Sequence, residues 1–70
     1  MPKAIHIDVR KLRESMHLSQ PEFARRFGFN LGTLRQWEQG RSSPDGAART
    51  LLVVIQKSPD AVCEAVREAS

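Results

Sequence analysis

Apolar residues recur along this chain at helical spacing rather than in the alternation typical of a β-strand. Val9, Leu12 and Met16 fall at i, i+3 and i+7, so one face of a helix would carry all three. Phe23 and Phe27 define a second such stripe, and the one stretch with period two is the short IHIDV near the start. The pattern therefore predicts an all-α fold.

Residues that favour helix ends stand on either side of these stripes. Asp8 is placed to cap the first helix, and Ser19 begins the second with capping-box spacing to Glu22. Pro21 falls in the first turn, where a missing N–H costs nothing. Gly28 is predicted to end this helix in the left-handed conformation, because glycine adopts positive φ without a steric penalty.

A third helix follows after a very short turn. Asn30 is its predicted N-cap, Leu34 and Trp37 face inward, and Gly40 ends it. Ala24 is a small residue at the point where the second and third helices are expected to cross closely, a position that requires a small side chain. Two short helices joined by a tight glycine turn form the helix-turn-helix pattern, here over residues 19–40.

The sequence Ser-Pro-Asp occurs twice, at residues 43–45 and 58–60. Each copy predicts a serine cap, proline at the first helical position and an acid beside the helix dipole. The fourth and fifth helices should bury apolar residues from Leu51, Leu52, Val54 and Ile55, and from Val62, Cys63, Ala65, Val66 and Ala69.

The predicted organisation is five short helices in one domain at residues 8–70, after a tail at 1–7. Residues 45–70 would hold the C-terminal helices that complete the core and form a dimer. The tail is expected to be disordered in the free domain, with an edge strand as the alternative.

Composition excludes several function classes. The net charge of +3 is uneven, since residues 1–44 carry +4 and residues 45–70 carry −1, which favours a polyanion partner for the first part. Cys63 is the single cysteine, and with only His6 and His17 beside it a Cys/His zinc site lacks ligands. Neither histidine accompanies a nucleophile motif, so we predict no enzyme, no metal and no cofactor.

The motif LSQxxFAxxxGxNxxTLxxWEQGxxxP, over roughly residues 9–57, resembles the lambda-repressor-like family (Cro/CI, XRE) of helix-turn-helix proteins. Within it, FARRFGF, TLRQWEQGR and PDGAARTLL are most similar to the HigA-type antitoxins of type II toxin–antitoxin systems. The resemblance implies a sequence-specific transcriptional repressor in the bacterial cytoplasm, associated with the nucleoid when bound. Antitoxins of this type often carry extra N-terminal residues, so a toxin-binding segment is short, lies elsewhere, or is missing from this chain.

In this fold the third helix enters the major groove. Gln36 can pair with adenine, and Thr33 can bond a base edge or a phosphate. Leu31 suits a thymine methyl or covers the core, while Gly32 either lets the backbone approach DNA or marks weak reading. Arg35 would read guanine if it reaches inward, and otherwise contacts a phosphate. The resemblance places Asn30, Leu31, Gly32, Thr33 and Gln36 nearest the bases, and with Arg35 the predicted base-contacting set is Asn30, Leu31, Gly32, Thr33, Arg35 and Gln36.

Phosphate contacts are expected where backbone donors and amides point outward together, at the start of the second helix and just after the third. Ser19 is expected to act as a helix cap more than as a phosphate ligand. Arg25 and Arg26 are expected to face solvent rather than a phosphate. The predicted phosphate-contacting set is Ser19, Gln20, Gln39, Arg41, Ser42 and Ser43.

Glu38 is an acid in a helix that is expected to face DNA. The resemblance pairs it with an arginine of the first helix, here Arg13. A partly buried arginine–carboxylate fork would neutralise the acid and hold the first and third helices together. Trp37 is expected to belong to the core rather than to stack on a base.

The fifth helix carries a narrow stripe of small residues, predicted to form either a two-fold dimer interface or a contact with the fourth helix of the same chain. The residues are Val62, Ala65, Val66 and Ala69. A homodimer would bind a palindromic double-stranded operator. The resemblance adds a second partner, a RelE/HigB-like mRNA-cleaving toxin. The alternatives are a stand-alone phage or XRE-type repressor, and a toxin-neutralising subunit with little DNA role.

Overall fold

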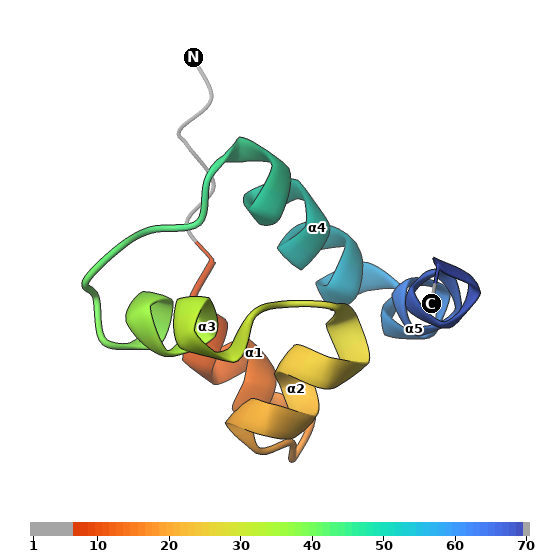
Figure 1. Cartoon of the computed structure of the whole chain (residues 1–70), viewed down its shortest axis with the longest axis horizontal. Helices are drawn as coiled ribbons and strands as arrows, with labels where there is room; N and C mark the ends of the chain where they lie inside the picture. The colour runs from red at the N-terminus through yellow and green to blue at the C-terminus, as the bar shows by residue number, and fades with distance from the viewer. Residues whose placement is uncertain (1–6, 70) are drawn as a thin grey trace.

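The computed structural model describes residues 7–69 as five helices with no strand in that range. The helices are α1 (Val9–Ser15), α2 (Gln20–Phe27), α3 (Leu31–Glu38), α4 (Gly46–Lys57) and α5 (Pro59–Ala69). Figure 1 shows α2 between α3 and α5, with α4 above them. The all-α prediction is confirmed. The tail prediction concerns residues that, apart from Ile7, lie outside the described range.

The first three helices begin where the sequence predicts, because their caps are local. Asp8 accepts a hydrogen bond from Lys11 N at 3.0 Å, and Asn30 accepts one from Thr33 N at 3.1 Å. Ser19 and Glu22 form the reciprocal capping box, at 3.2 Å and 2.9 Å. These bonds satisfy backbone donors that the first turn of a helix leaves free.

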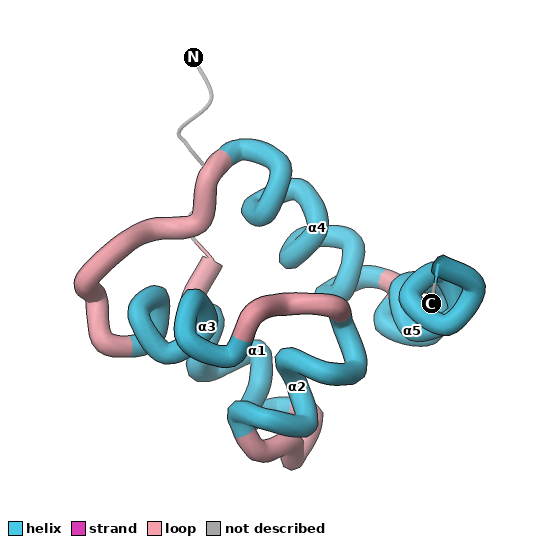
Figure 2. Tube along the Cα trace, viewed as in Figure 1, coloured by secondary structure: helices cyan, strands magenta, loops and turns pink. Residues whose placement is uncertain are grey.

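The predicted start of α4 is wrong by two residues. Asp45, not Ser43, is the N-cap, and its carboxylate accepts a hydrogen bond from Ala48 N at 2.9 Å. Pro44 therefore precedes the helix, in the long loop between α3 and α4 (Figure 2). The prediction for Pro59 as the first residue of α5 is confirmed. Ser58 ends α4, where its N–H donates to Val54 O at 2.7 Å.

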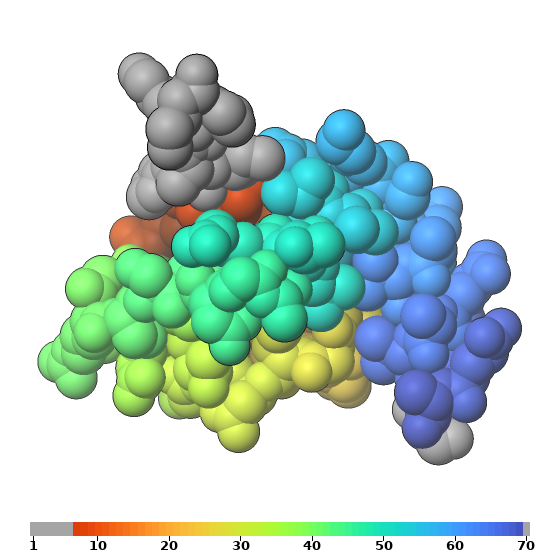
Figure 3. Space-filling view, turned by 90° about the horizontal axis from the view of Figure 1, so that it is seen from above, coloured from red at the N-terminus to blue at the C-terminus, as the bar shows by residue number. Residues whose placement is uncertain are grey.

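The core collects one face from every helix. Phe23, Leu34, Leu52 and Ile55 are each fully buried. Figure 3 shows the surface of the loop after α3 and that of α5 at opposite ends of the molecule. None of the helices in residues 7–69 is long and apolar enough to cross a membrane.

An aromatic cluster lies beneath the turn between α2 and α3. The rings of Phe23 and Phe27 meet edge to face with their centroids 4.8 Å apart, and Phe29 stacks on Phe23 with a centroid distance of 6.0 Å. Trp37 contacts Phe29 edge to face at 5.3 Å, and it packs against the core as predicted. The cluster joins both helices of the motif through ring contacts.

Gly28 ends α2 with φ +78°, the left-handed conformation that the sequence predicts. A Cβ placed there would lie 3.4 Å from Val66 Cγ2, so the principal cost of alanine is its backbone conformation. We expect Gly28→Ala to lower the free energy of unfolding by about 1–2 kcal/mol in urea titrations.

Gly46→Ala is the matched control for this substitution. Gly46 is the first residue of α4, and an added Cβ would meet nothing within 4 Å. Alanine should leave stability unchanged there or raise it by about 0.5–1 kcal/mol, because it reduces the backbone entropy of the unfolded chain. Equal destabilisation by both substitutions would contradict the role given to Gly28.

Candidate nucleic-acid interface

The outer edge of α3 is open to solvent over its whole length. Four exposed residues fall at i, i+3, i+4 and i+7, which places them on one face of the helix: Gly32, Arg35, Gln36 and Gln39. We call this face the reading edge. Leu34, on the opposite side, is fully buried and anchors the helix from beneath. The arrangement presents a guanidinium and two amides, the groups that pair with base edges in the major groove.

Two residues of the predicted base-contacting set, Leu31 and Thr33, are less exposed than the rest. Leu31 is half-buried and packs against the core, which matches the covering role offered as its alternative. Thr33 is also half-buried, and its N–H is taken by the cap at Asn30. A Cβ at Gly32 would lie 3.1 Å from that same cap oxygen, so this glycine also leaves room for the Asn30 side chain.

The predicted phosphate ligands form two groups in the structure. Ser19 is exposed and engaged in the capping box at the start of α2. After α3, Gln39, Arg41, Ser42 and Ser43 are exposed along the chain that leaves the helix. Arg41 N donates to Gln36 O at 2.9 Å, which fixes the start of this segment beside the reading edge.

Glu38 is the centre of a buried polar network. Its carboxylate is fully buried, and Arg13 reaches it twice, with Nε 2.7 Å from Oε2 and Nη2 2.9 Å from Oε1. The remaining Nη1 of Arg13 donates to Leu18 O at 2.9 Å. This bidentate pair joins α1 to α3 and leaves no uncompensated acid beneath the reading edge.

The Arg13 hydrogen bonds are the main cause of a lowered pKa at Glu38, with a smaller contribution from Gln20. Burial acts in the opposite direction, because it disfavours the charged form. Glu38 in turn raises the pKa of the Arg13 guanidinium through the same bonds. The pair is therefore ionised across the physiological range.

Two members of this network were not predicted. Arg10 Nε lies 3.4 Å from Glu38 Oε1, at an arginine side chain that is 55% exposed. Gln20, which is predicted to contact a phosphate, donates from Nε2 to Glu38 Oε1 at 3.1 Å and accepts from Arg35 Nε at 3.4 Å. One Nε2 hydrogen stays available for a phosphate. The spacing of Arg10 and Arg13, one helical turn apart, was the available signal for the first contact.

The stripe of small residues on α5 is divided between core and surface. Val62 is buried in the core of its own chain and Val66 packs against that core, whereas Ala65 and Ala69 are exposed. The helix contacts both α2 and α4. Its intrachain role is thus established, and the dimer stays a prediction.

Comparison with known proteins agrees with this geometry. A relative named antitoxin HigA-2, from Vibrio cholerae serotype O1, is 42% identical over 53 residues, which is 76% of this chain and 51% of the relative. The chain therefore spans about half the length of that protein. A crystal structure of a helix-turn-helix XRE-family-like protein from Agrobacterium tumefaciens matches with a TM-score of 0.82 and 41% identity, covering 87% of this chain and 98% of that one.

The helix-turn-helix family model matches residues 9–48, the segment that holds α1, α2, α3 and the start of α4. More than half of the chain lies in that match, which contains the reading edge, the capping box and the glycine turn described above. The chain belongs to the XRE-type helix-turn-helix family of DNA-binding proteins.

Proposed function

We propose that this protein is a sequence-specific transcriptional repressor that inserts α3 into the major groove of its own promoter. The observation that carries the proposal is the exposed edge of Gly32, Arg35, Gln36 and Gln39 above a fully buried Leu34. A rigid helix with amide and guanidinium groups on its outer side can make bidentate contacts with adenine and guanine. The stretch from Gln39 to Ser43 would follow the phosphate backbone beside it.

A single copy of the motif covers half of a site, so we propose a two-fold homodimer on a palindromic operator. Two-fold related recognition helices would then lie about 34–36 Å apart, one turn of B-DNA. The exposed Ala65 and Ala69 support α5 as the contact surface. The similarity to antitoxin HigA-2 supports a place in a toxin–antitoxin operon that this protein represses, with a RelE/HigB-like toxin as second partner.

Gln36→Ala tests base reading directly. We expect it to weaken binding to the promoter upstream of its own gene by about 1–3 kcal/mol, because the bidentate pair with a base is lost. Binding to a scrambled duplex should change little. Fluorescence anisotropy at two salt concentrations measures both affinities.

Arg41→Ala is the matched control, since Arg41 is exposed in the segment proposed to contact phosphates. It should weaken binding to both duplexes alike and reduce the slope of log affinity against log salt by about 1. Equal losses on the two duplexes for Gln36→Ala would refute base reading at that position. Failure of the wild type to prefer its promoter at low salt would end the proposal as a whole.

Co-expression with the neighbouring open reading frame separates the antitoxin from a stand-alone repressor. A co-purifying toxin, with growth restored in its presence, supports the antitoxin role. Promoter binding without any effect on the neighbouring gene product supports the stand-alone repressor.

A further inference from the structure

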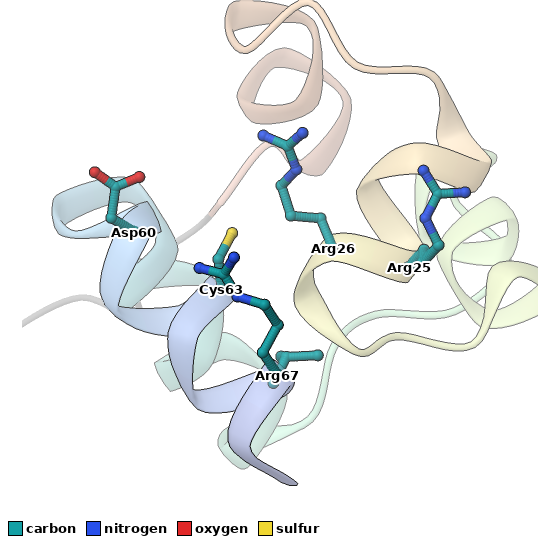
Figure 4. A pocket seen from close by; sticks show the side chains of 6 residues that line it. Arg25, Arg26, Asp60, Cys63 and Arg67 are labelled. Carbon is teal, nitrogen blue, oxygen red and sulfur yellow. The ribbon is translucent and has the colours of Figure 1, made fainter. Parts of the chain in front are cut away.

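An open pocket of about 470 Å³ lies between α2 and α5, and DNA reading makes no use of it. Its volume is in the range of ligand-binding clefts. Figure 4 shows Arg25 and Arg26 from α2 on one side and Asp60, Cys63 and Arg67 from α5 on the other. Val66 completes the lining, and we call this the basic pocket.

Three arginines and one acid give the basic pocket an excess of positive charge. Within residues 7–69, none of these arginines is joined to a carboxylate by an ion pair, since the bridges there run from Arg10 and Arg13 to Glu38. The carboxylate of Glu22, on the same helix as Arg25 and Arg26, is held by Ser19. That capping bond is the main cause of the lowered pKa of Glu22, to which the two arginines add a smaller effect.

The walls of the basic pocket are held in place by the core. Phe27 on α2 and Val62 on α5 are both buried. At the end of α2, a Cβ added to Gly28 would lie 3.4 Å from Val66 Cγ2 on α5. The two helices are therefore packed against each other behind the charged side chains. A site with a fixed frame loses less entropy on binding than a site formed by mobile loops.

The basic pocket is separate from the reading edge. In Figure 1, α2 lies between α3 and α5, and it packs against both of them. None of the described residues that line the pocket belongs to the exposed edge of α3 that is proposed to read bases. The Cys63 and Val66 surfaces in the lining suit an apolar side chain, which a phosphate backbone does not carry.

We propose that the basic pocket binds an acidic segment of a partner protein, with carboxylates on the arginines and an apolar side chain against Cys63 and Val66. Arginine forks match carboxylates in a bidentate manner, which provides orientation as well as charge. This interaction does not depend on DNA binding, so this protein could hold its operator and a partner at the same time.

The test uses the whole chain labelled with ¹⁵N and the acetylated peptide Glu-Glu-Leu-Glu-Glu-Leu, with Gln-Gln-Leu-Gln-Gln-Leu as its uncharged match. The acidic peptide should shift amide resonances along α2 and α5 in a saturable manner and slow the alkylation of Cys63 by iodoacetamide. Arg26→Gln and Arg67→Gln should each weaken its binding about tenfold, the effect of losing one charge-assisted hydrogen bond. Arg26 and Arg67 are exposed, so the variants should fold, which circular dichroism will check.

Arg49→Gln on α4 is the control, because it removes the same charge from an exposed site outside the pocket. Equal weakening by Arg49→Gln and Arg67→Gln would show general charge attraction and overturn the proposal. Absence of peptide binding at millimolar concentration would overturn it as well. So would inorganic phosphate or a scrambled duplex shifting the same resonances as strongly, since the pocket would then be a phosphate site. Loss of promoter binding in the same samples would bear only on the proposed repressor function.

Discussion

Glu38→Ala is expected to lower the free energy of unfolding by about 3–5 kcal/mol, the cost of leaving a buried ion-pair partner without its counter-charge. The carboxylate is fully buried, and the Arg13 side chain that it pairs with is only 15% exposed. A domain of this length has roughly 4–10 kcal/mol of stability in total, so this loss would be a large fraction of it. Urea titration followed by circular dichroism measures the loss.

Arg10→Ala is the matched control for that substitution. Arg10 also contacts Glu38, but at 3.4 Å and with more than half of its side chain in solvent. Exposed ion pairs contribute about 0.2–1 kcal/mol, so this variant should melt close to the wild type. A wild-type melting temperature for Glu38→Ala would show that the bidentate pair does not hold α1 to α3.

Acid titration gives an independent measure of the same pair. Because the pKa of Glu38 is lowered in the folded protein, its ionised form stabilises the fold above the unfolded-state value of about 4.3. That stabilisation is lost as the pH falls through the folded-state pKa. The difference in unfolding free energy between the wild type and Glu38→Gln should therefore shrink from neutral to strongly acidic pH. A difference independent of pH would mean that charge plays no part.

Phe23→Ala should cost about 3–5 kcal/mol of stability, the loss typical of truncating a buried phenylalanine. The ring is fully buried and contacts both Phe27 and Phe29, and Phe29 in turn supports Trp37. Removal would open a cavity beneath the turn that joins α2 to α3. The fluorescence of Trp37, the single tryptophan, reports the melting of this region directly.

Val54→Ala provides the comparison for Phe23→Ala. Val54 is the large apolar residue on α4 that is 40% exposed, and its truncation should change stability by no more than about 0.5 kcal/mol. If Phe23→Ala kept the wild-type melting temperature, the aromatic cluster would not stabilise the packing of α2 on α3.

The contacts of Glu38 bear on how an acidic residue can be placed in a helix that is proposed to read DNA. An uncompensated carboxylate on α3 would repel phosphates and reduce affinity. In this protein Arg13, Gln20 and Arg10 surround Glu38 with donors, and the acid holds helices together instead of facing the duplex. Support for the reading edge therefore comes from α1 and α2, which are not proposed to read bases themselves.

The sequence by itself determined the helices and most of their ends. A cap involves residues three or four positions apart, as with Ser19 and Glu22, so the local pattern specifies it without any tertiary contact. The start of α4 was missed because Ser43 and Asp45 are both good caps and the same proline fits either. Which of two neighbouring caps is used depends on where the helix must lie against the core.

The family resemblance identified Arg13 as the partner of Glu38, but only the tertiary structure decided which other side chains reach Glu38 and what lines the basic pocket. Glu38 takes hydrogen bonds from Arg13 and Gln20, which are 25 and 18 positions away, and Arg67 of α5 lines the same pocket as Arg25 and Arg26 of α2. Helical periodicity indicates which face of a helix is buried, but it does not indicate which polar side chains of other helices contact the residues beside that face. Those meetings are set by the packing angles of α1, α2, α3 and α5, which depend on the shapes of many buried residues at once.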